Sequence, residues 1–452
     1  MKRTGFLLLA ASSLLVATVA SSATRPHYGG TLHAAVQAAP SSLDPSQPDS
    51  PGLRNLFALI FDTLVTLDNQ GRPEPALANS WQSEPGDQRW QFSLRHGVSF
   101  QDGTPLTADV VATSLRAVNP SWKVLAAGNT VVIERDAPAS DLPAELALPR
   151  NSIVKREGGK VAGTGPFVVS QWEPAKRLVL VARDDYWGGR PFLGSIEIAM
   201  GQSFRDQMIA FDLDKAQLVE VAPEQARRAA TEGRRTLTSA PSELIAVIFT
   251  RGPQSPEEAK LREALSLSID RGLLNTVVLQ NGGEPAGGLL PSWITGYGFL
   301  FPVDVNMTRA QQERAEVPQA GLWNLTFDRN DPIARVLAER IMLSARDAGL
   351  RLQLASGAAA DVRLVRMPLA SLDAHIALSE LATALGLPQP VFHGGSVDDL
   401  YVAESTMLHS QRVIPLLHLR TACAVSNSLK NWSEAHDGSW RLANVWLSTE
   451  RQ

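Results

Sequence analysis

One stretch in the second half of the chain places a strand, a helix and a second strand in immediate succession. Residues 321–328, GLWNLTFD, have the pattern of a strand, residues 331–350 that of a helix, and residues 351–356, RLQLAS, that of another strand. Asp331 is expected to cap the helix and Gly349 to end it. Because a helix that links two adjacent strands makes a right-handed crossover between parallel strands, this unit predicts an α/β fold.

The first half of the chain contains a strand, a tight turn and a helix start. Apolar and polar residues alternate over residues 89–94, RWQFSL, which predicts a strand with one buried face. Asp102 and Gly103 form a turn signal, and Thr107 is placed to cap a helix. This local explanation accounts for each residue, so we interpret Asp102 as a turn residue and not as a catalytic acid.

The length of 452 residues exceeds what a single hydrophobic core usually serves. The chain is therefore long enough for two or three domains. A further strand and helix are expected near its middle. Residues 241–250 form a strongly apolar strand, and a helix follows with Ser255 at its cap, Pro256 at its first position and Glu258 where a capping box needs it.

The first residues have the pattern of a secretory signal peptide. Lys2 and Arg3 precede an apolar run at residues 5–19, and small residues follow, so cleavage is expected after Ala23. The alternative is a membrane anchor, but about 15 apolar residues are few for a span of roughly 20. No cysteine stands directly after the run, where a lipid anchor would need one, and Cys423 is the only cysteine in the chain. We therefore expect a soluble exported protein with no lipid anchor and no internal disulfide.

Charge and motifs exclude several classes of function. The formal charge of −4 becomes −6 once Lys2 and Arg3 are removed, and no basic patch is present, so nucleic acid is not expected as a partner. GTGPF at residues 163–167 lacks the Lys-Ser/Thr ending of a phosphate loop. His409 and His418 are nine residues apart, which does not suit zinc. We expect no metal, no cofactor and no enzyme activity.

A set of short motifs occurs in one order along most of the expected mature chain. These are YGGTL at residue 28, LDP at 43, IFDTLVTLDNQGRPEPALANSW at 60, LRHGVSFQDGTPLTADVV at 94, GTGPF at 163, DDYWGGRPFLGSIEI at 184, EEAKLREALSLSIDR at 257 and GLLPSWITGY at 288. Together they resemble the family 5 extracellular solute-binding proteins, which bind peptides, nickel complexes, opines or sugars for ABC importers.

The resemblance implies a two-lobed α/β periplasmic-binding-protein fold, of type II and similar to cluster C, with an inserted subdomain in lobe I. After the signal peptide (1–23), lobe I would comprise residues 24–242, with the insert at about 50–160. Lobe II would comprise residues 243–425, and residues 426–452 would return to lobe I. Chain crossings near residues 243–251 and 416–426 would form the hinge.

The sequence departs from the family pattern where relatives recognise their solute. Thr250 replaces the usual Asn after the Phe of the hinge strand. Peptide-binding relatives carry an aromatic-rich segment in lobe II with an acid for the peptide α-ammonium, but here residues 368–378, PLASLDAHIAL, are shortened. Asp373 is the only nearby acid. The solute, peptide-like or other, therefore stays open.

Arg366 is the first candidate for a solute contact. Ligands of open α/β sheets lie beyond the carboxyl ends of the strands, and Arg366 is nearer that end than Arg363, which points to the opposite face. Its fork of donors suits a carboxylate and hence an anionic or zwitterionic solute. The alternative is that Arg366 pairs with Asp373 or another surface acid. Trp293 and Tyr297 are candidates for an aromatic wall of the site, with core packing as the alternative.

These observations predict a monomeric periplasmic substrate-binding protein. Its partners would be a small organic solute, held between closing lobes, and an ABC permease in the inner membrane. A periplasmic ligand sensor or a chaperone-like module on the same fold is the alternative, and a hydrolase has the least support.

Overall fold

The computed structural model describes residues 25–46, 53–158, 160–319, 321–355, 360–432 and 435–448. The expected signal peptide and its cleavage position lie outside these residues. Within the described ranges, no helix has the length and apolar character needed to cross a bilayer.

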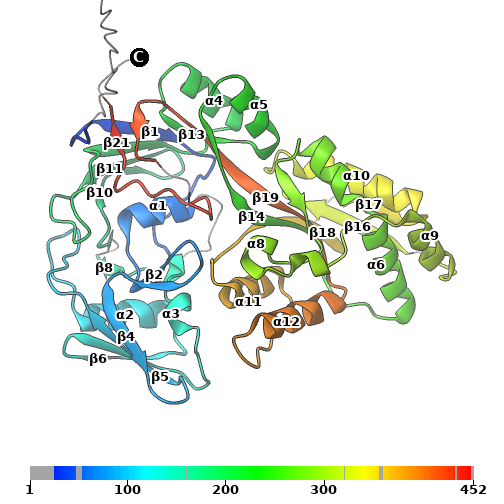
Figure 1. Cartoon of the computed structure of the whole chain (residues 1–452), viewed down its shortest axis with the longest axis horizontal. Helices are drawn as coiled ribbons and strands as arrows, with labels where there is room; N and C mark the ends of the chain where they lie inside the picture. The colour runs from blue at the N-terminus through cyan, green and yellow to red at the C-terminus, as the bar shows by residue number, and fades with distance from the viewer. Residues whose placement is uncertain are drawn as a thin grey trace, which may run out of the picture.

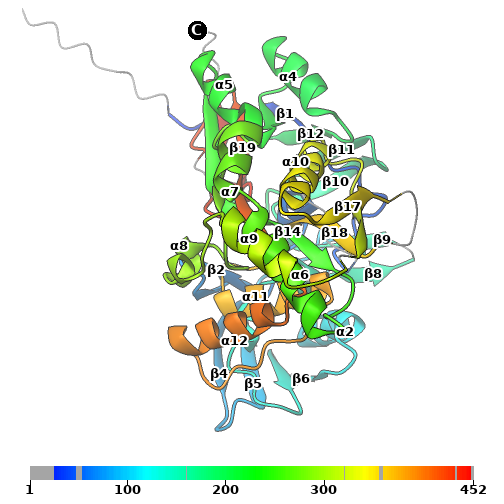
Figure 2. The same cartoon turned by 90° about the vertical axis from the view of Figure 1, so that its right-hand side faces the viewer.

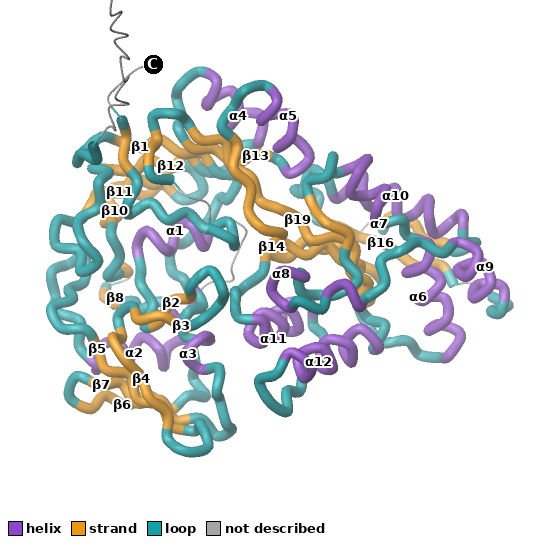
Figure 3. Tube along the Cα trace, viewed as in Figure 1, coloured by secondary structure: helices purple, strands orange, loops and turns teal. Residues whose placement is uncertain are grey.

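One large mixed sheet runs through the molecule and joins two lobes (Figure 1). Its order is β10-β11-β12-β1-β13-β19-β14-β18-β16-β17. The long central strands β14 (Thr236–Phe249) and β19 (Val413–Val425) belong to both lobes and pair with each other in antiparallel fashion. The tube view shows helices on both sides of these strands in lobe II (Figure 3). The α/β fold expected from the strand–helix–strand unit is confirmed.

The sheet of lobe I consists of β1, β10, β11, β12 and β13. Parallel pairing joins β1 to both β12 and β13, and antiparallel pairing joins β10, β11 and β12. Helix α1 covers one face with Leu56, Phe57 and Ile60, and helices α4 and α5 pack on the other. The bounds are β1 (Thr31–Ala35), β10 (Phe167–Glu173), β11 (Arg177–Ala182), β12 (Ser195–Ala199), β13 (Leu218–Val221), α1 (Leu53–Ile60), α4 (Phe204–Asp212) and α5 (Ala226–Thr231).

A separate four-stranded sheet, β4-β5-β7-β6, carries helix α2 and has its own hydrophobic core. The buried and half-buried residues of β5 alternate as the sequence predicts. Thr107 caps α2 by accepting a hydrogen bond from the Val110 amide, and Gly103 has a φ of +80°, so the predicted turn and helix start are confirmed. The bounds are β4 (Ala78–Ser83), β5 (Arg89–Leu94), β6 (Lys123–Ala127), β7 (Thr130–Glu134) and α2 (Ala108–Val118).

Lobe II packs helices on both faces of β14, β18, β16 and β17. Helices α6 and α10 lie on one face, and α8, α11 and α12 lie on the other. Figure 2 views the molecule from the end that carries α6, α9 and α10. The bounds are β16 (Leu322–Phe327), β17 (Arg351–Leu354), β18 (Val362–Pro368), α6 (Pro256–Ser268), α8 (Ser292–Thr295), α10 (Ala334–Asp347), α11 (Ala374–Leu385) and α12 (Val397–His409).

The strand–helix–strand unit is present, with one correction at the start of its helix. Strands β16 and β17 pair in parallel, as predicted. Helix α10, however, begins at Ala334 rather than directly after Asp331. Asp331 Oδ1 accepts a hydrogen bond from the Ile333 amide, two residues on, and this local turn delays the first helical residue. Gly349, with a φ of +76°, follows the helix end.

Strand β14 changes neighbours where the chain passes between the lobes. Thr236 to Thr238 pair with β19 residues next to β13, whereas Glu243 and the following residues also pair with β18. The register shifts around Pro241, which has no amide hydrogen to donate to the ladder. The crossing in β14 therefore lies just before the expected segment 243–251. The lobe boundaries themselves stay a prediction.

The C-terminal segment packs against the core of lobe I through Trp432, Trp440, Leu442 and Val445. The remaining elements are β2 (Val65–Leu67), β3 (Pro73–Pro75), α3 (Leu142–Glu145), η1 (Pro149–Asn151), β8 (Lys155–Glu157), β9 (Lys160–Ala162), η2 (Pro223–Gln225), α7 (Arg271–Leu273), η3 (Leu274–Val278), β15 (Gly283–Pro285), η4 (Gly298–Leu300), α9 (Met307–Ala315), β20 (Leu429–Lys430) and β21 (Trp446–Leu447).

Candidate functional site

Five ionisable side chains gather where the two lobes meet, at or near the ends of several strands. Lobe I contributes Glu220 from the end of β13 and Glu224 from η2. Lobe II contributes Glu243 from β14, Asp331 from the turn after β16 and Arg366 from the end of β18. All four carboxylates act on Arg366 electrostatically. We call these five residues the crevice cluster.

Arg366 lies at the centre of the crevice cluster. Its Nε donates to Glu243 Oε2 at 2.6 Å, and its Nη1 is 3.9 Å from Asp331 Oδ1. Desolvation lowers the pKa of Arg366, but the carboxylates of Glu243 and Asp331 outweigh this and raise it. Arg366 is therefore charged and already engaged by two acids. Its acid partners are Glu243 and Asp331 and not Asp373, and Glu243 is a buried acid, not the surface acid that the alternative expected.

Glu220 is held in place by polar groups of lobe I. Its Oε2 accepts a hydrogen bond from the Gln37 amide at 2.6 Å, directly after β1, and another from Gln207 Nε2 at 3.4 Å. Burial raises the pKa of Glu220, and the charge of Glu243 adds to the rise. Two strand ends of lobe I and one strand of lobe II thus converge on this carboxylate.

The carboxylate of Glu224 has fewer hydrogen-bond partners than that of Glu220. Its Oε2 is buried and has no hydrogen-bond partner among the residues that the structure describes. Burial raises the pKa of Glu224, and the charge of Asp331 raises it further. Burial likewise raises the pKa of Asp331. Four acids therefore share one guanidinium, and each ionised acid in excess of Arg366 lacks a compensating charge.

The acids of the crevice cluster do not form a metal site. In the described part of the chain, no group of three or more His, Cys, Asp or Glu side chains is placed to hold a metal ion.

Asp373, the second predicted site residue, caps a helix. Its Oδ1 accepts hydrogen bonds from the amides of His375 and Ile376 at the start of α11, both at 3.0 Å. A capping carboxylate is used by the helix, so this contact explains Asp373 without a solute.

Trp293 and Tyr297 make structural contacts around α8. Trp293 Nε1 donates to the Pro241 carbonyl at 2.8 Å, and its ring meets that of His436 edge-on at 5.7 Å. The Tyr297 hydroxyl donates to Glu404 at 2.7 Å, and only 5% of Tyr297 is exposed. These contacts match the core-packing alternative for Tyr297, while Trp293 links lobe II to the β14 crossing.

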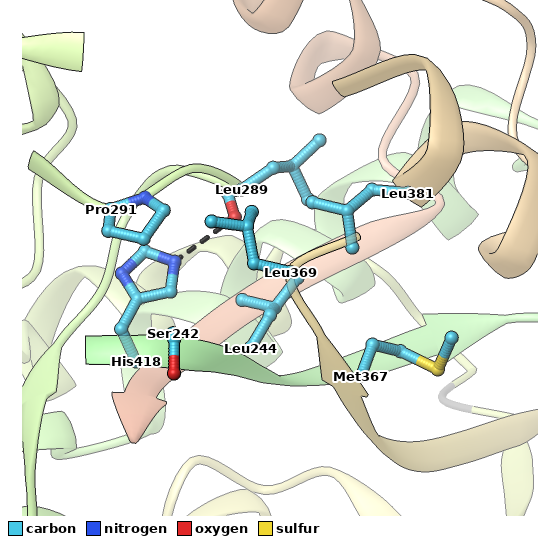
Figure 4. Close-up of a pocket in the computed structure, with 8 residues that line it drawn as sticks. All are labelled: Ser242, Leu244, Leu289, Pro291, Met367, Leu369, Leu381 and His418. Carbon is cyan, nitrogen blue, oxygen red and sulfur yellow. Dashed lines mark hydrogen bonds between the residues drawn. The ribbon is translucent and has the colours of Figure 1, made fainter. Parts of the chain in front are cut away.

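A narrow apolar gap beside β14 has a free volume of about 0 Å³ and no room for a water molecule (Figure 4). Leu289, Pro291, Met367, Leu369 and Leu381 are among its lining residues, with Ser242, Leu244 and His418. His418 Nε2 donates to the Leu289 carbonyl at 3.1 Å, and burial lowers the pKa of His418 to about 4. A neutral buried histidine in an apolar space smaller than a typical solute pocket points to a structural role.

The sequence contained a signal for the acids that our predictions missed. Glu220 is the only charged residue in the apolar strand LVEV, and Glu243 begins the apolar run ELIAVIF. A charge on a strand that is otherwise buried is a reason to expect a partner or a function. Their meeting with Arg366 depends on the order of the strands, which the sequence does not give.

The chain matches the model of the bacterial extracellular solute-binding proteins, family 5, over residues 72–392, which is more than half of its length. The chain belongs to this family. Among its relatives, the uncharacterized protein YhjP of Bacillus subtilis is 37% identical over 41% of this chain and 34% of YhjP. The probable D,D-dipeptide-binding periplasmic protein DdpA of Escherichia coli is 26% identical over 64% of this chain and 62% of DdpA. The chain thus spans less than two thirds of either relative.

The fold of this family 5 member agrees with solved structures. NikA from Staphylococcus aureus, crystallised in complex with Ni(L-His)2, superposes with a TM-score of 0.76, 17% identity, and coverage of 92% of this chain and 100% of NikA. At this identity the likeness establishes the two-lobed fold.

Proposed function

We propose that this protein is a substrate-binding protein that captures a small organic solute between its two lobes and delivers it to an ABC permease. The observation that carries this proposal is the crevice cluster, because both lobes contribute to it and closure therefore assembles it. A site completed only on closure couples solute capture to a change of shape that a permease can recognise. The names of the relatives, which are those of binding proteins, favour binding without catalysis.

The charges of the crevice cluster favour a solute with a positively charged group. Arg366 was expected to attract a carboxylate, but Glu243 and Asp331 already engage it. Glu224 retains a buried oxygen with no partner among the described residues, and the charge of the same guanidinium acts on it. An amino or guanidino group would neutralise this excess and satisfy that oxygen. Such a group occurs in dipeptides, the class of ligand in the name of DdpA.

Matched pairs of solutes test this proposal. Thermal unfolding of the mature protein would be followed with free dipeptides, diamines and arginine derivatives, each beside its N-acetylated or uncharged analogue. We expect stabilisation by a member with the free cationic group and little by its neutral analogue. Mass spectrometry of the natively purified protein would identify any solute that it retains.

The outcomes separate transport from the alternative. A defined solute that stabilises the protein and is lost on Glu224→Gln supports the proposed site. Preference for anionic analogues would contradict the cationic assignment while leaving the family function intact. If no small molecule stabilises the protein but a periplasmic protein binds it, the sensor or chaperone-like function is favoured.

We also propose export to the periplasm in soluble form, as the family and the first residues suggest. N-terminal sequencing of the exported protein should begin near Thr24. Retention of Met1, or recovery in membranes alone, would contradict this.

A further inference from the structure

A second region of contact between the lobes lies away from the crevice cluster. Helix α3 and η1 of the lobe I subdomain face helix α11 of lobe II, below the crossing of β14 and β19 in Figure 1. The segment 369–373, which leads from β18 into α11, is part of the same contact. This is the segment that the family resemblance led us to expect to be shorter than in peptide-binding relatives.

An ion pair joins Arg150 of η1 to Glu380 of α11. Both guanidinium Nη atoms donate to the two carboxylate oxygens, with Nη2 at 2.9 Å from Oε1. About one third of the Arg150 side chain and one quarter of that of Glu380 are exposed, at 34% and 24%. Within lobe I, Arg150 lies 4.0 Å from Glu145, which pairs with Arg135 at 2.9 Å. Glu145 therefore helps to hold the guanidinium in the orientation that meets Glu380.

Arg54 binds the segment 369–373 from the lobe I side. Its Nη2 donates to the carbonyls of Leu369 at 2.7 Å and Ala370 at 3.1 Å. Its Nη1 lies 3.7 Å from Asp437 of the C-terminal segment. Two carbonyls of lobe II are thereby held by a side chain that lobe I fixes.

Gly71, in the turn between β2 and β3, approaches the same segment closely. Its φ is +77°, and a Cβ at this position would be 2.3 Å from the carbonyl oxygen of Leu372. Only a residue without a side chain permits this approach of two backbones. Beside it, Ala144 and Leu148 of lobe I form a small apolar cluster with Ile376 of lobe II.

We infer that Arg150 and Glu380 are positioning residues of a latch through which the two lobes close on each other by their own contacts. We define the latch as Arg54, Gly71, Arg150 and Glu380 with the segment 369–373. Its residues are distinct from those of the crevice cluster, so it biases the equilibrium between open and closed forms without contacting the proposed solute site. In this latch the segment 369–373 serves the closure of the lobes, through its contacts with Arg54 and Gly71.

The distance between the lobes tests this inference without any solute. Spin labels would be placed at Leu125→Cys on β6 and Val402→Cys on α12, both exposed, in a Cys423→Ala background. The distance distribution of the solute-stripped protein would then be measured by pulsed electron paramagnetic resonance. We expect Arg150→Gln to lower the ratio of closed to open molecules by about threefold, as a partly exposed ion pair contributes. Arg335→Gln removes the Arg335–Glu339 pair within α10 and is the matched control.

A double-mutant cycle distinguishes the pair from two separate effects. Arg150→Gln and Glu380→Gln should each open the lobes, the double variant should open them no further, and Arg150→Lys should restore part of the closed population. Distributions that match the wild type in all of these variants, or effects that add in the double variant, would overturn the inference.

Two glycines provide a further comparison. Gly71→Ala and Gly103→Ala impose the same left-handed strain, since their φ values are +77° and +80°, but a Cβ at Gly103 meets nothing within 4 Å. We expect only Gly71→Ala to shift the distance distribution toward the open form. Equal distributions for the two variants would contradict the close approach as a closing contact. Since no solute is involved, failure here leaves the proposed transport function standing.

Discussion

Glu404 and Glu224 are two carboxylates whose pKa is raised by burial, yet their surroundings differ. Glu404 of α12 accepts hydrogen bonds from the Leu290 amide at 3.0 Å, the Leu289 amide and the Tyr297 hydroxyl. Glu224 has a buried oxygen that finds no partner in the described part of the chain, and it shares Arg366 with other acids. The first carboxylate is satisfied by its own lobe, and the second is satisfied only in part. Burial alone therefore does not mark a functional acid, and the proposed role of Glu224 depends on its incomplete hydrogen bonding at the junction of the lobes.

The largest effect on the free energy of unfolding is expected at Glu404, whose carboxylate has all of its hydrogen bonds within its own lobe. Glu404→Ala leaves two backbone amides and one hydroxyl of the α8 loop without their acceptor. We expect a loss of about 3 kcal/mol in the free energy of unfolding, measured by urea denaturation. Glu404→Gln keeps one acceptor oxygen and should lose about half as much. A loss below about 1 kcal/mol for the alanine variant would show that Glu404 is not the anchor of this loop.

The second effect concerns the only cation of the crevice cluster. Arg366→Met leaves Glu243 unpaired and removes the charge that lowers the pKa of Glu220, Glu224 and Asp331. We expect a loss of about 2 kcal/mol in the free energy of unfolding near pH 7.

The pH dependence of the Arg366→Met variant follows from the sign of these shifts. An acid whose pKa is raised on folding holds its proton more tightly in the folded state, so stability falls as the pH rises from the ordinary value to the raised one. The deficit of Arg366→Met should therefore shrink toward about pH 5. An equal deficit at both pH values would indicate lost packing instead of uncompensated charge.

The sequence predicted the individual strands and helices of this fold better than the contacts between them. The strand of residues 89–94, the Thr107 cap and the parallel pair around α10 follow from local periodicity and turn chemistry. The order of strands in the sheet depends on long-range pairing, which local patterns do not encode. For the same reason Arg366 was placed correctly at a strand end, while its partners Glu243 and Asp331 were not identified.

The candidate site shows why residue types alone are not enough to predict which side chains contact a solute. Asp373, Trp293 and Tyr297 were chosen because an acid and aromatic rings suit a solute, but a helix cap, a carbonyl and Glu404 occupy their polar groups. A side chain can satisfy a nearby backbone group as readily as a ligand. Only the packed structure shows which polar atoms remain available.

A smaller effect on the free energy of unfolding, a gain and not a loss, is expected at Glu224. Glu224→Gln removes a charge that is partly desolvated and not fully compensated, so the free energy of unfolding near pH 7 should rise by about 1 kcal/mol. The gain should disappear as the pH falls toward about 4.5, where the folded wild type has taken up its proton. Solute affinity should fall in the same variant. Loss of stability in urea denaturation would place Glu224 with Glu404, as a structural acid.

The smallest effect on the free energy of unfolding is expected at Asp102, an exposed carboxylate whose partners Lys155 and Thr104 belong to its own lobe. Lys155 Nζ donates to its Oδ2 at 2.6 Å, and the Thr104 amide donates to its Oδ1 at 2.9 Å. The hydrogen bonds from Lys155 and then Thr104 lower the pKa of Asp102 to about 2. Because 38% of the side chain is exposed, solvent screens the pair, and Asp102→Asn should cost only about 0.5 kcal/mol near pH 7.

The pH dependence of this last variant has the opposite sign to that of Glu224→Gln. An acid with a lowered pKa stabilises the folded state above its ordinary value, near 3.8, and this contribution is lost as the pH falls toward about 2. The difference between wild type and Asp102→Asn in urea denaturation should therefore vanish over that range. Solute affinity should not change, because Asp102 turns the chain in the lobe I subdomain and the asparagine amide oxygen can still accept from Thr104. If Asp102→Asn folds with wild-type stability but no longer binds the solute, Asp102 is a functional acid although its hydrogen bonds are made by its own lobe. Complete hydrogen bonding would then fail to separate structural from functional acids in this protein.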